Sequence, residues 1–294
     1  MEKRARTPSR VGLAAAGVLC LASVVLAQSD SGGDGPSRLA VGFSGVLLDD
    51  VNMNDACAAI KIWTETVARN RGLPVTTTTE VFVDTAMIRK RLASREANLL
   101  VISMLDYLQI EGEGLADPWS VPTVGGKAFA EYLVLVHRDS GIQKLADLKG
   151  KSLLMEKTGY TNSLARLWLD VRLLEEGLPE SQSVFQQIKE ATRVARVCLP
   201  VFFRQGDACL VNRRGYETLT ELNPQIGQQL VPLAASPKYP TSILCVSRFY
   251  QSDLRGELLK GLAELHQDAR GQQILTIFRV DKLVAFEPSH LAQV

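Results

Sequence analysis

The sequence predicts an α/β fold in which helices cover mainly parallel sheets. The first observation behind this prediction is a regular alternation of short apolar runs with longer stretches of helical periodicity. The second is that the alternation occurs twice, before and after a stretch rich in glycine and proline at residues 111–127. The chain of 294 residues is long enough for one large domain or for two of ordinary size.

The first set of units consists of three strands that alternate with three helices. The strands are expected at residues 38–43, 81–83 and 99–102. The helices are expected at residues 54–69, 85–95 and 103–111. Apolar residues recur on one face of the first helix, and Asp84 or Thr85 is expected to cap the second. A βαβαβ order of this kind predicts a parallel sheet covered by helices.

The second set begins with a long apolar strand and continues with the same alternation. The strands are expected at residues 132–137, 152–155, 184–188, 208–211, 229–233 and 241–246. The helices are expected at residues 163–176, 191–204, 213–222, 252–267 and 269–277. Gly177 is expected to end the first of these helices, and residues 236–240 form a turn flanked by proline.

The amino-terminal residues have the three parts of a secretory signal. Residues 1–10 are basic, residues 11–27 are apolar, and small residues precede Gln28, where cleavage is expected. Cys20 lacks a small residue directly before it, which favours a cleaved protein over a lipid-anchored one. A retained membrane anchor stays open, because 17 apolar residues are near the lower limit for a span. Residues 28–37 form a flexible leader.

The charge balance and the cysteines exclude several classes of function. Removing residues 1–27 leaves 29 Lys and Arg against 31 Asp and Glu, so the chain lacks the basic face of a nucleic-acid binder. No C-x-x-C spacing occurs, and the three histidines are far apart, so no metal or other cofactor is expected. Cys198 and Cys209 are placed to face each other, and buried free thiols are favoured over a bridge.

A polar loop that leads into the helix at residues 163–176 contains the candidate anion-binding residues. Thr161, Asn162 and Ser163 are all good N-cap residues, and the positive end of the helix dipole favours an anion there. The alternative is that one of the three caps the helix and the other two are solvated. Both interpretations stay open on the local sequence.

Four segments together resemble periplasmic solute-binding proteins of the phosphate, phosphite and phosphonate type. They are the loop at residues 50–55, the Asp-Leu-Lys-Gly-Lys element at residues 147–151, the Thr-Asn-Ser helix start at residues 161–163, and Gly-Asp-Ala at residues 206–208. The resemblance implies a type II fold with two lobes, two hinge strands and a small ligand between the lobes. It implies lobe 1 at residues 38–137 and 236–294, and lobe 2 at residues 138–235.

The candidate ligand contacts lie where strands end and helices begin, since ligands of open α/β sheets bind there. Ser44 follows the first strand, and the turn from Ser103 to Tyr107 follows the third. Arg213 and Arg214 are expected to be solvated, and Asp207 to be a structural residue of its turn. The expected ligand contacts are Ser44, Ser103, Tyr107, Tyr160, Thr161, Asn162, Ser163 and Asn212.

The resemblance implies the substrate-binding component of an ABC transporter, a monomer that passes a small anionic solute to a membrane permease. Two alternatives stay open. One is an extracytoplasmic module that senses the same ligand for a membrane partner. The other is an enzyme on the same fold, although no serine elbow, H-E-x-x-H or paired-carboxylate motif occurs.

Overall fold

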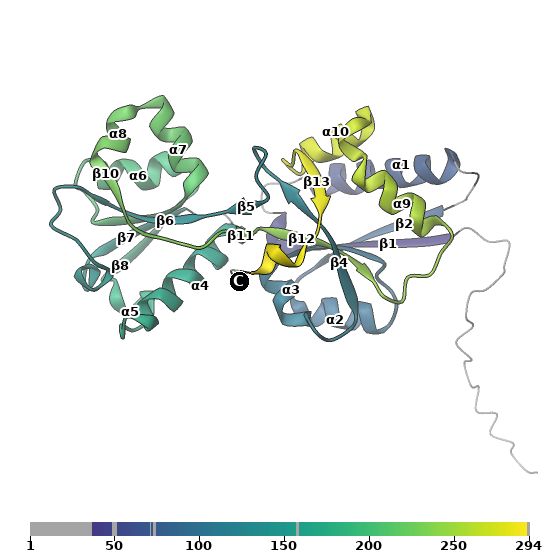
Figure 1. The fold of residues 1–294 in the computed structure, drawn as a ribbon, viewed down its shortest axis with the longest axis horizontal. Helices are drawn as coiled ribbons and strands as arrows, with labels where there is room; N and C mark the ends of the chain where they lie inside the picture. Colours follow the sequence, from purple (N-terminus) through teal and green to yellow (C-terminus); the bar gives the residue numbers. More distant parts are fainter. Residues whose placement is uncertain (1–36, 49–51, 71, 73–74, 157–158, 293–294) are drawn as a thin grey trace, which may run out of the picture. The chain divides into compact units, whose positions relative to one another are not determined.

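Two mixed sheets, each covered by helices, form the computed structural model (Figure 1). The structure describes residues 37–48, 52–70, 72, 75–156 and 159–292, and gives the backbone alone at residues 70 and 159–163. The expected signal peptide, and the leader up to residue 36, lie outside the described residues. We call the six-stranded sheet with its helices lobe 1, and the five-stranded sheet with its helices lobe 2.

The sheet of lobe 1 has the strand order β13-β4-β12-β3-β1-β2. Its strands are β1 (Ser37–Ser44), β2 (Val75–Phe82), β3 (Leu99–Ser103), β4 (Ala116–Thr123), β12 (Ser242–Ser247) and β13 (Lys282–Ala285). Strands β2, β1 and β3 are parallel, and the other three pair antiparallel. The helices are α1 (Met53–Asn70), α2 (Thr85–Ala93), α3 (Met104–Ile110), α9 (Leu254–Ala263) and α10 (Ala269–Ile277).

The sheet of lobe 2 has the order β10-β6-β9-β7-β8. Its strands are β6 (Tyr132–His137), β7 (Ser152–Glu156), β8 (Gln187–Ala191), β9 (Ala208–Asn212) and β10 (Leu230–Ala235). Strands β8, β7 and β9 are parallel, and β6 and β10 run antiparallel to their neighbours. The helices are α4 (Gly159–Glu175), α5 (Ser181–Val184), α6 (Val194–Phe202), α7 (Arg213–Leu222) and α8 (Pro224–Gln229).

The remaining elements are short. They are the strands β5 (Phe129–Ala130) and β11 (Tyr239–Pro240), which pair with each other, and the 3₁₀ turns η1 (Gly45–Leu47), η2 (Leu145–Leu148), η3 (Leu265–Gln267) and η4 (Pro288–Leu291).

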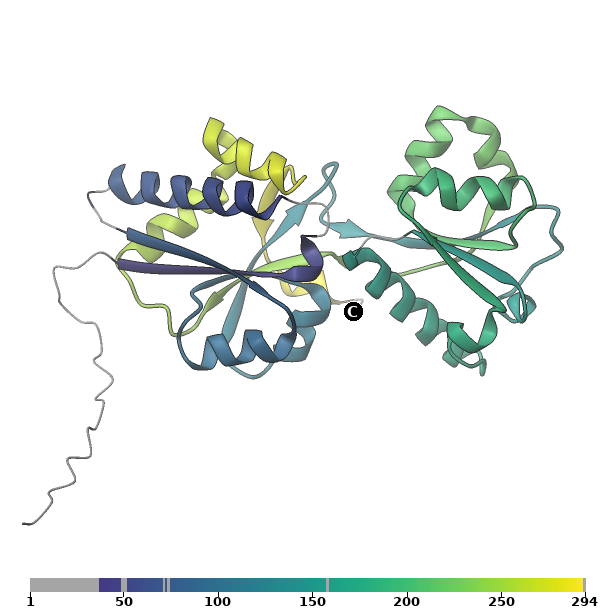
Figure 2. The ribbon, with the colours of Figure 1, turned by 180° about the vertical axis from the view of Figure 1, so that it is seen from behind.

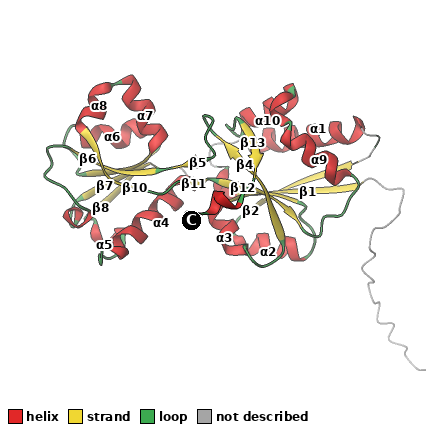
Figure 3. Ribbon diagram, in the orientation of Figure 1, coloured by secondary structure: helices red, strands yellow, loops and turns green. Residues whose placement is uncertain are grey.

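Helices cover both faces of each sheet (Figure 2 and Figure 3). In lobe 1, α1, α9 and α10 share one apolar cluster with the sheet, while α2 and α3 belong to another. In lobe 2, α6, α7 and α8 lie on one face, and α4 and α5 on the other. The sheets therefore bury both faces, which explains why their central strands are continuous apolar runs. Trp63 and Trp168 are buried in these clusters, as their helical spacing predicts.

The α/β fold with two sheet-based lobes is confirmed, and parallel pairing is confined to β2-β1-β3 and to β8-β7-β9. Strand β6 belongs to the sheet of lobe 2, and the expected lobe boundaries stay a prediction. Strand β4 lies within residues 111–127, which the sequence predicts to be irregular because prolines disfavour a central strand. A register shift in the pairing of β4 with β12, next to Pro118, accommodates the first of these prolines.

Candidate functional site

Three hydroxyl groups at one edge of the lobe 1 sheet converge on a single carboxylate. Ser44 ends β1, Thr85 begins α2 after β2, and Ser103 ends β3, so all three follow the carboxyl ends of parallel strands. The hydroxyls of Ser44 and Ser103 donate to Oδ2 of Asp106 over 2.5 and 2.7 Å, and that of Thr85 donates to Oδ1 over 2.6 Å. Ser44 and Ser103 therefore lie together, as the sequence predicts, but their protons are directed at Asp106.

Asp106 is held from its own helix as well. Its backbone N–H donates to Oγ of Ser103 over 3.0 Å, and the N–H of Ser103 donates to Oγ of Ser44 over 3.3 Å. The four side chains form one connected polar network at the start of α3. Sequence reasoning missed Asp106 and Thr85, although Asp106 lies within the Ser103–Tyr107 turn that it singled out. The signal was an acidic residue in the first turn of a helix that follows an apolar strand.

Tyr107, expected as a ligand contact, lies in the core of lobe 1. Its side chain is buried, and its ring centroid is 6.4 Å from that of Phe286. Burial raises the pKa of Tyr107 to about 12. A wall of an open site presents its ring to solvent, so in this structure Tyr107 has a packing role.

Helix α4 begins at Gly159, four residues before the start at residue 163 that the sequence predicts. The expectation that Thr161 and Asn162 precede the helix is therefore wrong: both belong to its first turn, and Ser163 follows that turn. The side chains of Tyr160 and of these three residues lie outside the described part of the chain. Because the first N–H groups of a helix lack intrahelical partners, the anion-attracting end of α4 moves to residues 159–162. Good N-cap residues also occur inside first turns, which is why the prediction missed the boundary.

Asn212 lies at the carboxyl end of β9 and caps α7. Its Oδ1 accepts a hydrogen bond from the backbone N–H of Arg214 over 2.9 Å. Arg213, expected to be solvated, instead donates to Oε1 of Glu131 over 2.8 Å and is half-buried. Because this ion pair occupies the guanidinium, Arg213 and Arg214 do not form a paired clamp for an oxyanion.

Asp207 has the structural role that the sequence predicts. Its Oδ2 accepts from both the backbone N–H and the hydroxyl of Ser152, over 2.8 and 2.7 Å. Burial acts to raise the pKa of Asp207, but the hydrogen bonds from Ser152 and the nearby Lys151 outweigh it and lower the pKa. These bonds tie the start of β7 to the turn before β9.

Two further polar residues near the start of α4 were missed by the sequence analysis. Glu156 is the last residue of β7, and Tyr132 is the first residue of β6. Both line a small cavity together with Asn212, which is one of the eight predicted contacts. The signal for Glu156 was a carboxylate that closes an apolar strand directly before the polar loop.

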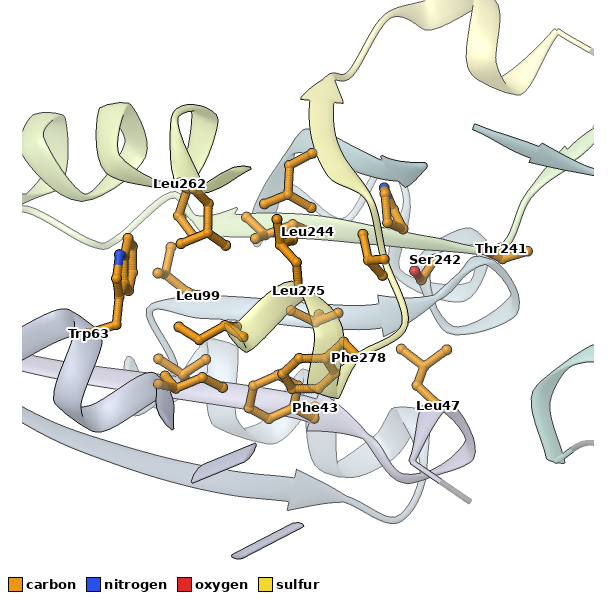
Figure 4. A pocket seen from close by; sticks show the side chains of 18 of the residues that line it. Phe43, Leu47, Trp63, Leu99, Thr241, Ser242, Leu244, Leu262, Leu275 and Phe278 are labelled. Atoms are coloured by element: carbon orange, nitrogen blue, oxygen red, sulfur yellow. The ribbon is translucent and has the colours of Figure 1, made fainter. Parts of the chain in front are cut away.

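Lobe 1 contains an apolar cavity whose lining does not suit an oxyanion. It has a volume of about 230 Å³ and lies between β1, β3, β12 and the helices α1 and α10 (Figure 4). Its lining has no charged side chain, and its polar residues are Thr64, Thr241 and Ser242. Phe43 and Phe278 stack beside it with ring centroids 5.5 Å apart. Because an unpaired charge in such surroundings is strongly disfavoured, this cavity does not suit an anion.

A comparison of the sequence with family models identifies the family. The model described as "ABC transporter, phosphonate, periplasmic substrate-binding protein" matches residues 58–291. The chain belongs to this family. It is therefore the periplasmic substrate-binding component of a phosphonate-type ABC transporter. No curated protein matches the chain.

Solved structures show the fold of this phosphonate-binding family member. XAC2383 from Xanthomonas citri, bound to chloride ion, is 16% identical, with 87% of this chain and 94% of that chain covered and a TM-score of 0.62. A binding protein component of an ABC phosphonate transporter from Pseudomonas aeruginosa is 14% identical, with 87% and 84% covered and a TM-score of 0.53. PhnD1 from Prochlorococcus marinus, in complex with methylphosphonate, is 15% identical, with 88% and 96% covered and a TM-score of 0.50.

Two kinds of feature are absent from the described residues. No group of three or more His, Cys, Asp or Glu side chains there is arranged to hold a metal ion. No helix in that part of the chain is long and apolar enough to cross a membrane.

Proposed function

We propose that this phosphonate-family protein captures a small oxyanion, of the phosphonate, phosphite or phosphate kind, between its two lobes. The observation that supports the location is the start of α4. This 17-residue helix begins directly beyond the carboxyl end of β7, in the parallel part of the lobe 2 sheet. Its first N–H groups and its dipole favour negative charge without an arginine.

In this proposal, residues 160–162 supply backbone donors, and Thr161 and Ser163 supply their hydroxyls. Asn212 adds its amide N–H₂ from the end of β9, because its Oδ1 already serves as the cap of α7. Ser44 and the Ser103–Tyr107 turn contribute from lobe 1. Because their hydroxyls donate to Asp106, the contribution of lobe 1 includes the carboxylate as an acceptor for a donor group on the solute.

The double variant Thr161→Ala, Ser163→Ala tests the site. A lost hydrogen bond to a charged ligand costs about 1.5–3 kcal/mol, so calorimetry should show an affinity for methylphosphonate at least about tenfold weaker. The thermal midpoint without ligand should change little. Ser183→Ala, an exposed serine on α5 in the same lobe, is the matched control and should keep wild-type affinity. Unaltered affinity in the double variant contradicts the site.

We also propose that the chain is exported through a cleaved signal and works as a monomer with a membrane permease. The family is periplasmic, and the basic and apolar residues 1–27 supply the means of export. Mass spectrometry of the periplasmic fraction should find an amino terminus near Gln28. Recovery of the intact chain from membranes alone would contradict cleavage.

A further inference from the structure

Three polar side chains meet at the end of the lobe 2 sheet with unused hydrogen-bonding capacity. Tyr132 and Asn212 are directly opposite in the pairing of β6 with β9, and Glu156 follows Met155, which pairs with Leu210 on the other side of β9. The three line one cavity of about 10 Å³, the size of a single small group. Adjacent strands therefore bring a phenol, an amide and a carboxyl to one point.

Within this set, the hydroxyl of Tyr132 gives the strongest indication of a ligand. The side chain is 1% exposed, and its hydroxyl has no hydrogen-bond partner within the described residues. Glu156 is also without a hydrogen bond or ion pair in that part of the chain, although it is more than half buried. Buried polar groups in folded proteins are nearly always paired, so this pair of unsatisfied groups indicates a place where a ligand completes the bonding.

The cavity continues into a space large enough for a solute. Glu156 and Asn212 also line a hollow of about 1090 Å³ beside α7. The charges there are partly paired, since Glu131 binds Arg213. On the neighbouring strand β8, the residue opposite Glu156 is the uncharged Ala191. Among the described residues, the other charged groups that line this hollow are Lys127, Glu131, Arg213, Arg214, Glu217 and Lys238, and Tyr239 acts on Tyr132.

The electrostatic environment follows from this arrangement. Burial raises the pKa of Glu156. Burial, followed by the nearby Tyr239 and Glu156, raises the pKa of Tyr132, so its hydroxyl keeps its proton. The set thus offers two donors, the phenol and the Asn212 amide, beside one carboxyl that either accepts or donates according to its own protonation.

We propose that Glu156, together with Tyr132 and Asn212, selects oxyanions that carry a hydroxyl proton over oxyanions that are fully ionised. The inference rests on the proposed function and names the ligand chemistry of that site. An ionised carboxylate repels an ionised oxygen but accepts a hydrogen bond from P–OH, while Tyr132 and Asn212 donate to the remaining oxygens. Phosphonate, phosphite and phosphate monoanions carry this proton, and a sulfonate does not.

Calorimetry with methylphosphonate and methanesulfonate at about pH 7 tests the inference. The wild-type chain should prefer methylphosphonate by about tenfold or more. Glu156→Gln should reduce that preference by at least about tenfold, because its amide also donates to an ionised oxygen. Glu180→Gln, at an exposed glutamate of lobe 2 without a side-chain cap bond, should keep the wild-type preference.

A second measurement uses the unaltered protein. Because methanesulfonate does not titrate between about pH 5 and about pH 8, any change in its affinity reports a group of the protein. Because burial raises the pKa of Glu156 above its ordinary value, this affinity should fall as the pH rises over this range and the carboxyl ionises. If Glu156→Gln binds methylphosphonate with an unchanged preference, or if the affinity for methanesulfonate does not change with pH, the inference is wrong while the proposed function stands. Binding of neither ligand by the wild type overturns the proposed function, and the inference with it.

Discussion

At the scale of single residues, the ionised carboxyl of Glu156 that the proposed selectivity requires lowers the stability of the folded chain at neutral pH. Burial raises its folded pKa, so the native state holds this proton more tightly than the unfolded state does. The stability is therefore complete below the ordinary pKa of a glutamate, about 4.3, and is lost as pH rises from there through the raised folded pKa. An ionised carboxyl without a partner is the source of this loss.

Glu156→Gln should consequently be more stable than the wild type at neutral pH. Thermal unfolding without ligand should show a higher midpoint for the variant at about pH 7 and the same midpoint at about pH 4. Glu180→Gln is the control, since that exposed side chain gains nothing from neutralisation. A variant that is less stable at neutral pH would show that the carboxylate has a stabilising partner.

The Asp106 carboxylate should stabilise the folded chain, because Ser44, Thr85 and Ser103 all donate to it. Asp106→Asn replaces one acceptor oxygen with a donor group and leaves at least one of these hydroxyls without its acceptor. We expect a loss of about 1–3 kcal/mol in the free energy of unfolding, measured with denaturant. Glu111→Gln, exposed at the end of the same helix, should change it little.

The sequence located residues correctly where a strand end defines a position, while their role as ligand contacts stays a prediction. Ser44, Ser103 and Asn212 were found because they close apolar runs, and the structure places them at strand ends. Asp106 was missed because two of its three partners are distant in sequence: Ser44 is 62 residues away and Thr85 is 21 residues away. The orphaned hydroxyl of Tyr132 was missed for the same reason, since an absent partner is visible only after the strands are assembled.

At the scale of elements, the packing of α6 on β9 places Cys198 and Cys209 in one buried cluster. Both are free thiols, as favoured by the sequence, and so are Cys57 and Cys245. A hydrogen bond with Cys198, together with burial, raises the pKa of Cys209 well above its usual value, and burial raises that of Cys245. Thiols of this kind react slowly, because the thiolate is the reactive form.

A thiol reagent should therefore label Cys57, which is partly exposed, much faster than the other three cysteines of the chain that starts at Gln28. Unfolding should make all four reactive. If only two thiols react after unfolding without reductant, two of the four cysteines form a disulfide in the native protein, and the free-thiol description is wrong.

Most elements could be predicted because periodicity is local, while their boundaries and pairings are not. Strand β4 was missed because Pro118 and Pro122 disfavour a strand, and only pairing with β12 and β13 shows how the sheet accommodates them. The early start of α4 escaped the N-cap rule because several residues in a row qualify as caps. The antiparallel pairing of β12 with β3 depends on how the chain returns from lobe 2, which no local pattern contains.

At the scale of the whole molecule, one chain supplies two lobes whose sheet edges carry different groups. Lobe 1 offers a carboxylate held by three hydroxyls. Lobe 2 offers the start of a long helix beside Glu156, Tyr132 and Asn212. Under the proposed function, a solute with an oxyanion and a hydrogen-bond donor would satisfy both, which gives the acidic groups of this chain a role.

Calorimetric titration of the chain that starts at Gln28 with methylphosphonate tests the central claim most directly. The account predicts saturable binding of one ligand per chain. It also predicts a matching gain in thermal stability, about 2.7 kcal/mol in the free energy of unfolding when the ligand is at a hundred times its Kd. A folded chain that gives no heat and no thermal shift with methylphosphonate, phosphite or phosphate would contradict the claim that this site captures phosphorus oxyanions.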